Sequence, residues 1–135
     1  MTLNIELLER SFSLVKEHAT DFTEIFYTNL FTDYPETKPL FSNAHMEEQG
    51  KKLFSSLVLT IDSLRKPEVL AKTLRGLGTK HIKYGVLPQH YPMVGNSLLK
   101  SLESSLEYAW TDDVKQAWVE AYTAVTELML EGADF

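Results

Sequence analysis

The chain of 135 residues contains no cysteine, and this absence excludes several kinds of chemistry. Without thiols the protein forms no disulfide, holds no cysteine-ligated zinc or iron–sulfur cluster, and attaches no cofactor through a thioether bond. A chain without disulfides is typical of a reducing compartment. Residues 1–6 lack the basic start and the long apolar run of a signal peptide. We therefore expect a cytoplasmic protein.

Long apolar runs and clusters of basic residues are missing as well. No segment reaches the roughly 18 apolar residues that a membrane-spanning helix needs. The 13 Lys and Arg residues form no block, and the net charge is -6 with a pI of about 5.2. Because an acidic surface repels phosphate groups, the sequence predicts no nucleic-acid partner. It also offers no basic patch for a membrane surface.

Glycine and proline are scarce, with six and five residues, and no window shows the alternation of a β-strand. Apolar residues instead recur every three or four positions, which is typical of amphipathic helices. No repeat, linker or low-complexity tract interrupts this pattern, so we expect a single domain over residues 1–135. The pattern predicts an all-α fold of about seven helices, near residues 3–15, 20–34, 35–41, 53–61, 67–85, 88–106 and 111–129.

One histidine, His81, has neighbours that suit a metal ligand. Leu77 lies one helical turn earlier, so its backbone carbonyl is placed to bond one imidazole nitrogen. Tyr91 is a second candidate partner if the next helix crosses nearby. Such a partner fixes the tautomer of the ring and strengthens its other nitrogen as a ligand. A lone histidine in a helix is more often an ordinary surface or core residue. His81 alone therefore does not indicate a metal site, and residues elsewhere in the chain have to be considered.

A second set of residues lies upstream. Tyr27 follows Phe26 on an apolar helix, and a buried phenol usually has a hydrogen-bond partner. Gln49 and Leu53 are four positions apart and therefore share a helix face. Taken singly, Tyr27, Gln49 and Leu53 are better explained as parts of an ordinary core and its boundary, and Phe41 is explained equally well as a core residue.

Together these segments resemble the globin family, in particular single-domain bacterial globins and the haem domain of flavohaemoglobins. The resemblance covers nearly the whole chain. The segments that carry it are Phe26-Tyr27, Pro39-Leu40-Phe41, Gln49-Gly50-Lys51-Lys52-Leu53, His81, Gly85-Val86, His90-Tyr91-Pro92, Thr111-Asp112-Asp113, Ala117-Trp118 and Ala121-Tyr122.

The resemblance implies one non-covalent haem b, with His81 as the proximal ligand of the iron. On the distal side it implies that Tyr27 and Gln49 hydrogen-bond the bound gas, while Leu53 limits access. His45, one turn before Gln49, is an alternative sixth ligand of the iron. The residues expected to line the haem are Phe41, Leu53, Leu77, Val86, Tyr91, Val94 and Leu98.

The chain departs from the family pattern in its last helix. In flavohaemoglobin-like globins a glutamate there joins the proximal histidine and a tyrosine in a hydrogen-bonded trio. Ala133 falls at the aligned position of this sequence, and Glu131 is the nearest candidate. The side chains expected beside His81 on the proximal side of the haem are therefore Tyr91 and Glu131.

The function implied by the resemblance is reversible binding of O2, with CO and NO as further ligands, for oxygen binding, storage or delivery. The alternative is an enzyme, a nitric oxide dioxygenase, and the sequence does not decide between the two. Relatives that perform that reaction fast carry a fused reductase domain. This sequence ends at Phe135, so we expect any reductase to be a separate protein. A monomer and a homodimer are both compatible with the sequence.

Overall fold

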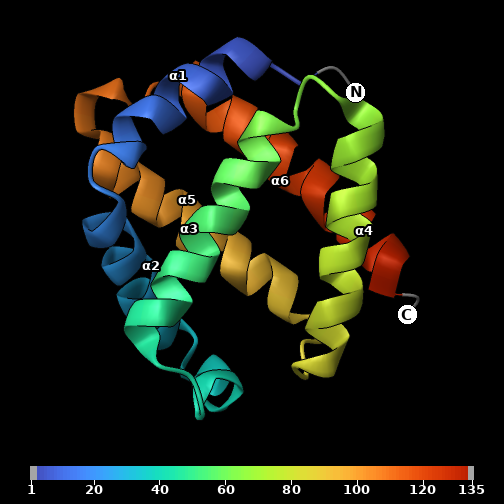
Figure 1. The fold of residues 1–135 in the computed structure, drawn as a ribbon. Helices are drawn as coiled ribbons and strands as arrows, with labels where there is room; N and C mark the ends of the chain where they lie inside the picture. Colours follow the sequence, from blue (N-terminus) through green and yellow to red (C-terminus); the bar gives the residue numbers. More distant parts are fainter. Residues whose placement is uncertain (1–2, 134–135) are drawn as a thin grey trace.

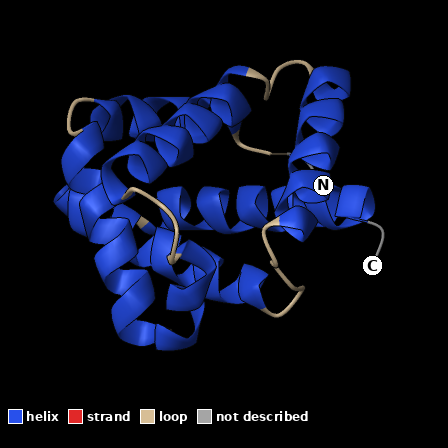
Figure 2. Cartoon of the chain, turned by 60° about the horizontal axis from the view of Figure 1, so that its bottom comes forward, coloured by secondary structure: helices blue, strands red, loops and turns tan. Residues whose placement is uncertain are grey.

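Helices account for most of residues 3–133, the part of the chain that the computed structural model describes (Figures 1 and 2). The prediction of an all-α fold is confirmed, and no strand occurs within those residues. A short helix before the last long one was not expected from the sequence. The elements are α1 (Ile5–Lys16), α2 (Ala19–Asp33), η1 (Pro35–Phe41), α3 (Met46–Asp62), α4 (Pro67–Lys83), α5 (His90–Leu106), η2 (Glu107–Ala109) and α6 (Asp112–Ala133).

Local sequence explains where several of these helices begin. The Asn4 side chain accepts a hydrogen bond from the Leu7 amide at 3.3 Å, which caps α1. Thr111 does the same for α6 through the Val114 amide at 3.2 Å. Pro67 occupies the first turn of α4, where its missing N–H costs nothing. α2 begins at Ala19, one residue before the expected start, and His18 precedes it without a side-chain cap bond.

The end of α4 has the conformation that its glycine predicts. Gly85 adopts φ +87°, in the left-handed region that favours glycine. Its amide donates to the Ile82 carbonyl at 3.0 Å, and the Val86 amide donates to the His81 carbonyl at 3.0 Å. This pair of bonds is the Schellman arrangement. The backbone of His81 is therefore fixed at the C-terminal end of its helix.

The helices that flank the candidate site are supported by different partners. α4 packs chiefly on α6, α3 on α2, and α2 also on α5. α3 and α4 lie at the front of the molecule, with α5 and α6 behind them (Figure 1). Large apolar side chains with almost no exposed surface form the core between the helices, among them Leu8, Phe22, Leu30, Leu74 and Leu102. Among the described residues, no helix is long and apolar enough to cross a bilayer.

Candidate functional site

Aromatic side chains from α2 and η1 meet around Tyr27. The Tyr27 ring lies edge-on to Phe26 and Phe41, with centroids at 4.9 and 5.4 Å. Phe31 lies 5.9 Å from Tyr27 and 5.5 Å from Phe41. Edge-to-face packing at these distances is favourable. The prolines and short helix of η1 thus bring Phe41 against the same face of α2 that carries Tyr27.

The Tyr27 phenol is buried, with 8% of the residue exposed. Burial raises the pKa of this phenol, and the nearby Gln49 side chain opposes part of the rise. The structure therefore brings together Tyr27 and Gln49, which are 22 positions apart in sequence. The phenol remains protonated at neutral pH, so it keeps a hydrogen to donate.

A glycine that the sequence analysis did not single out sets this meeting of α2 and α3. Gly50 is buried, and a Cβ built on it would lie 3.0 Å from the Thr23 hydroxyl oxygen. Thr23 is one turn before Tyr27, and Gly50 follows Gln49 directly. The small residue therefore allows the close approach of the two helices that carry the polar pair. Its only signal in the sequence was a glycine inside a helical pattern.

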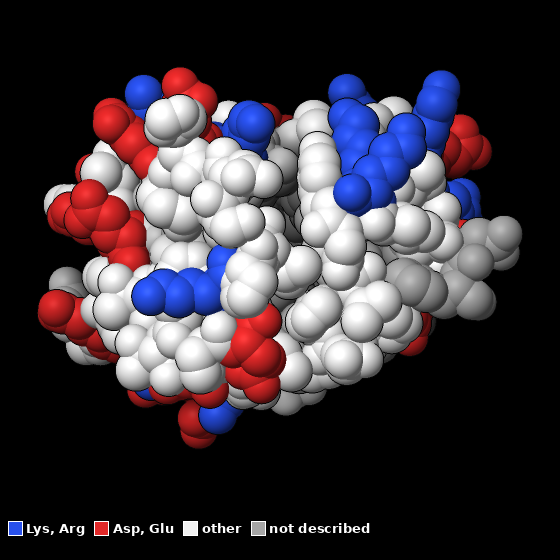
Figure 3. All heavy atoms as spheres, turned by 90° about the horizontal axis from the view of Figure 1, so that it is seen from below, with Lys and Arg blue, Asp and Glu red and all other residues white. Residues whose placement is uncertain are grey.

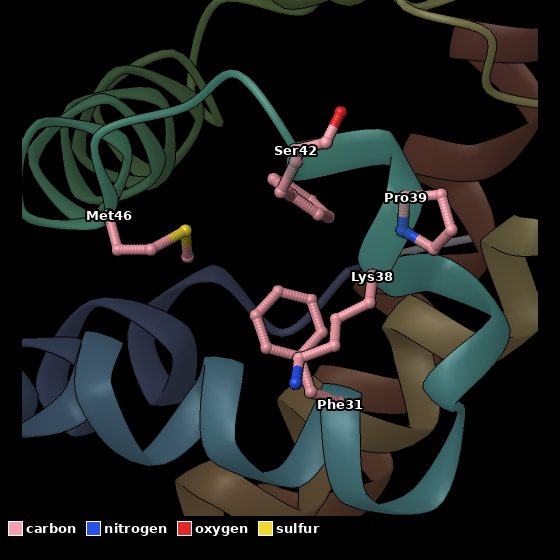
Figure 4. Close-up of a pocket in the computed structure, with 6 residues that line it drawn as sticks. Phe31, Lys38, Pro39, Ser42 and Met46 are labelled. Atoms are coloured by element: carbon pink, nitrogen blue, oxygen red, sulfur yellow. The ribbon is translucent and has the colours of Figure 1, made fainter.

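A pocket of about 380 Å³ lies beside this aromatic cluster (Figure 4). Phe31 and Phe41 belong to both, so the pocket shares a wall with the surroundings of Tyr27. Its volume is within the range of about 300–1,000 Å³ that is usual for small-molecule pockets. The lining residues are Phe31, Lys38, Pro39, Phe41, Ser42 and Met46.

On α4 the imidazole of His81 is held by its own helix. Its Nδ1 lies 2.6 Å from the carbonyl oxygen of Leu77, the partner that the sequence predicted. Since a carbonyl only accepts, Nδ1 carries the hydrogen and Nε2 keeps its lone pair. A neutral imidazole with Nε2 free is the form that binds a metal ion. The Tyr84 ring lies edge-on to His81, with centroids 5.8 Å apart.

Apolar residues expected to line a cofactor divide into two groups. Leu98 and Tyr91 are buried, whereas the five others are only half-buried although they pack against the core. Apolar side chains of the second kind are typical of the walls of an open cleft. The surface seen from below is hollowed between its left and right parts (Figure 3). The half-buried residues are Phe41, Leu53, Leu77, Val86 and Val94.

Two tyrosines lie where α5 and α6 cross. The Tyr122 hydroxyl donates to the Tyr91 carbonyl oxygen at 2.6 Å. Gly95 makes this possible, because a Cβ there would overlap the Tyr122 ring. Burial raises the pKa of both phenols. The Tyr91 hydroxyl itself is buried and has no hydrogen-bond partner within residues 3–133, which is unusual for a buried polar atom.

Comparison with known proteins identifies the family of this chain. The model of the family described as Globin matches residues 24–129. A globin-like protein of Aquifex aeolicus (strain VF5) is 33% identical over 126 residues, which cover 93% of this chain and 88% of that protein. The chain belongs to the globin family.

Other relatives are larger or more distant. A flavohemoprotein of Rhizobium meliloti is 30% identical over 126 residues, and the match covers 92% of this globin but only 31% of that protein. Among solved structures, a bacterial globin from Campylobacter jejuni has a TM-score of 0.84 at 25% identity, with 96% and 94% of the two chains covered. A hexacoordinated haem protein from a tardigrade has a TM-score of 0.88 at 17% identity, with 100% of this chain and 96% of that chain covered. That last similarity concerns the fold alone.

Membership of the globin family implies a haem site, and the residues of this globin fit one. His81 offers a free Nε2, and the half-buried apolar residues of α3, α4 and α5 suit a flat apolar cofactor. Tyr27, a buried hydrogen-bond donor, lies on α2, whereas His81 lies on α4. The buried hydroxyl of Tyr91 is an unpaired polar atom within residues 3–133 that a bound cofactor would satisfy.

The expected partnership of Glu131 with His81 does not appear. The Glu131 carboxylate instead forms an ion pair with Arg75 at 3.1 Å, and its side chain is 55% exposed. The physical reason is the way in which α4 and α6 cross. Residue 131 of α6 lies beside Arg75, which is six positions before His81 on α4. Tyr91 likewise makes no hydrogen bond to His81, whose Nδ1 is bonded to Leu77. His45, the alternative distal ligand, is exposed and is the residue immediately before α3 in the sequence.

The raised phenol pKa values predict a loss of stability at high pH. Tyr27, Tyr91 and Tyr122 hold their protons more tightly when folded than when unfolded. Their contribution to stability is therefore complete below pH of about 10, the ordinary tyrosine pKa, and is lost as the pH rises above it. One such group changes the free energy of unfolding by up to about 1.4 kcal/mol per pH unit.

Tyr122→Phe tests this prediction, since it removes one of the three phenols. Urea unfolding measured between pH 8 and 11 should show a shallower decline for the variant than for the parent protein. Tyr108→Phe is the matched control, because Tyr108 is 94% exposed. Equal slopes for the parent and Tyr122→Phe would contradict the assignment.

Proposed function

We propose that this globin binds O2 reversibly at a haem b held by His81, with CO and NO as further ligands. The observation that carries the proposal is the buried Tyr27 phenol with Gln49 beside it, on a different wall from the free Nε2 of His81. Haem bound in this cleft would supply a ferrous iron that coordinates diatomic gases. The remaining steps depend on side chains of the chain itself.

Tyr27 acts as a hydrogen-bond donor to the gas. The aromatic cluster holds the protonated phenol in one orientation. Because the side chain is buried, bulk water does not compete with the phenol for the bound gas. Gln49 orients the phenol, and its amide N–H is a second hydrogen-bond donor. Bound to a ferrous haem, O2 would carry more negative charge than CO would. These donors therefore favour O2 over CO.

The proximal residues keep the iron ligand in one orientation. Leu77 accepts from Nδ1 of His81, and the Schellman turn fixes the His81 backbone. Leu53 and Val94 exclude water from the cleft by covering it with apolar surface. Water exclusion strengthens the bond that Tyr27 donates, because its electrostatic energy is larger in a medium of low polarity.

Tyr27→Phe is the experiment that tests the O2 role. A hydrogen bond to a partly charged acceptor contributes about 1.5–3 kcal/mol, so we expect O2 to dissociate roughly tenfold to a hundredfold faster. CO dissociation should change much less. Both rates are measured by stopped-flow displacement on the haem-loaded ferrous protein.

Two further variants make the result specific. Tyr108→Phe removes an exposed phenol and should leave both rates unchanged. Gln49→Leu, alone and combined with Tyr27→Phe, forms a double-mutant cycle, and we expect a coupling between the two positions because they contact each other. An O2 off-rate that is unchanged in Tyr27→Phe would refute the proposed role of this phenol.

A further inference from the structure

The charges of this globin are segregated along the chain. Between Glu68 and Glu103 there are five Lys or Arg residues and no acidic residue. Residues 103–135, in contrast, contain eight acidic residues and one lysine. The basic stretch comprises most of α4 and the first part of α5. A protein with a net charge of -6 therefore carries a basic region around His81.

Helix α4 gathers part of this charge on its outward side. Lys72, Gly76, Lys80 and Lys83 follow one another at intervals of three or four residues, so they share one face of the helix. All four are exposed, and nothing lies within 4 Å of a Cβ built on Gly76. The lysines are not adjacent in sequence, which is why no basic block is visible there.

These lysines differ from the other two basic residues of the region. Arg75 pairs with Glu131, and Lys100 pairs with Asp33 at 3.0 Å. Within residues 3–133, Lys72, Lys80 and Lys83 form no ion pair. Lys and Arg side chains project from the right of the molecule seen from below, where Figure 1 places α4, beside the hollow (Figure 3).

An exposed aromatic side chain completes this face. Tyr84, one turn after Lys80, is 62% exposed. Its ring lies 5.8 Å from that of His81. Exposed tyrosines among basic residues are typical of protein interfaces, where they act as anchors inside a polar rim. We name Lys72, Lys80, Lys83 and Tyr84 the lysine face.

We propose that the lysine face is the docking surface for an acidic protein that delivers single electrons to this globin. The inference rests on the proposed function, because the electron is used to restore ferrous iron. The donor would be a flavoprotein: its reduced flavin would lose one electron, and the ferric iron of the bound haem would gain it and become ferrous, with no atom transferred. Tyr84 and His81 give the docked donor a short path from the surface to the iron ligand.

The charge distribution favours a small protein partner over an extended anionic surface. The basic face is local, and electrostatic attraction is screened beyond about 8 Å at physiological ionic strength. A compact acidic protein contacts the lysine face alone. A membrane or a nucleic acid also approaches the acidic remainder of the surface and is repelled by it. Small, polar and transient interfaces are usual for electron-transfer partners.

The test uses a reduced flavodoxin as the acidic donor and the haem-loaded ferric globin as acceptor. Lys80→Glu/Lys83→Glu should slow the bimolecular reduction at least tenfold at low salt, and the parent rate should fall steeply as salt is added. Lys16→Glu/Lys115→Glu changes the net charge by the same amount on α1 and α6, and both lysines are exposed. This control should stay within about twofold of the parent.

Two additional measurements separate docking from other effects. Reduction by lumiflavin, a small uncharged donor, should be equal in all variants. Carbodiimide cross-linking joins amines to carboxylates in contact, and mass spectrometry should locate the links to flavodoxin at Lys80 and Lys83. Cross-linking does not require electron transfer, so it still tests the docking surface if the protein fails to take up haem and the proposed function is wrong.

Several results would overturn the inference. Equal slowing in both double variants would mean that only total charge matters. Slower reduction by lumiflavin in Lys80→Glu/Lys83→Glu would mean that the lysines act on the haem and not on a partner. Links confined to other lysines would place the donor elsewhere. Self-association that sedimentation detects in the parent and that the lysine variants lose would assign the face to a second copy of the chain.

Discussion

His81→Ala should lose the axial ligand of the haem and with it the gas-sensitive spectrum of the protein. No other histidine is placed to replace it, because His18 and His45 are exposed and Nδ1 of His90 accepts from the Leu87 amide at 2.9 Å. Removing only an outer partner of a metal-bound histidine typically weakens metal binding tenfold to a hundredfold. We expect removal of the ligand itself to weaken haem retention by more than about a hundredfold.

The measurement is a haem titration followed by absorption spectra of the ferrous, O2-bound and CO-bound forms. His81→Gly with added imidazole is the most informative companion variant. The free imidazole should enter the space left by the side chain and restore the spectrum, which a merely misfolded protein would not show. His18→Ala and His45→Ala are matched controls and should behave as the parent protein. A spectrum that is indifferent to His81 would exclude this residue as the iron ligand.

Features encoded within one or two helical turns were predictable from the sequence. The Leu77 carbonyl lies next to His81 because residues four apart share a helix face. Gly85 ends α4 because only glycine adopts its positive φ without strain. Thr111 caps α6 for a similarly local reason. The all-α fold follows from the same periodicity, summed over the chain.

Features that depend on how two helices cross were not predictable in this way. Glu131 was the glutamate nearest to the position at which related globins carry one. The crossing of α4 and α6 instead places it in an ion pair with Arg75. Gly50 and Gly95 were unremarked in the sequence, although both allow a neighbouring helix to approach.

The crossing of α4 and α6 should be the contact most sensitive to substitution. A Cβ on Gly78 would overlap the backbone carbonyl of Met129, and one on Gly132 would overlap that of Arg75. The Thr79 hydroxyl donates to the Gly132 carbonyl at 2.8 Å across the same contact. Because the obstacle is backbone and not a flexible side chain, Gly78→Ala forces the helices apart. Overpacking of this kind costs about 1–3 kcal/mol or more.

Gly76→Ala is a control of unusual sharpness, because it is the same substitution on the same helix two residues earlier. Nothing lies within 4 Å of its added methyl group. Alanine is favoured over glycine in a helix by about 1 kcal/mol, so Gly76→Ala should raise the free energy of unfolding while Gly78→Ala lowers it.

Urea unfolding of proteins with equal haem content measures this difference, since bound haem itself adds stability. Gly132→Ala should resemble Gly78→Ala, because it separates the same two helices. His81 lies less than one turn beyond Gly78, so a displaced α4 should also move the imidazole and change the haem spectrum of Gly78→Ala but not that of Gly76→Ala. Equal stabilities for Gly76→Ala and Gly78→Ala would mean that α4 and α6 do not meet through their backbones, and that the position of His81 is set by some other contact.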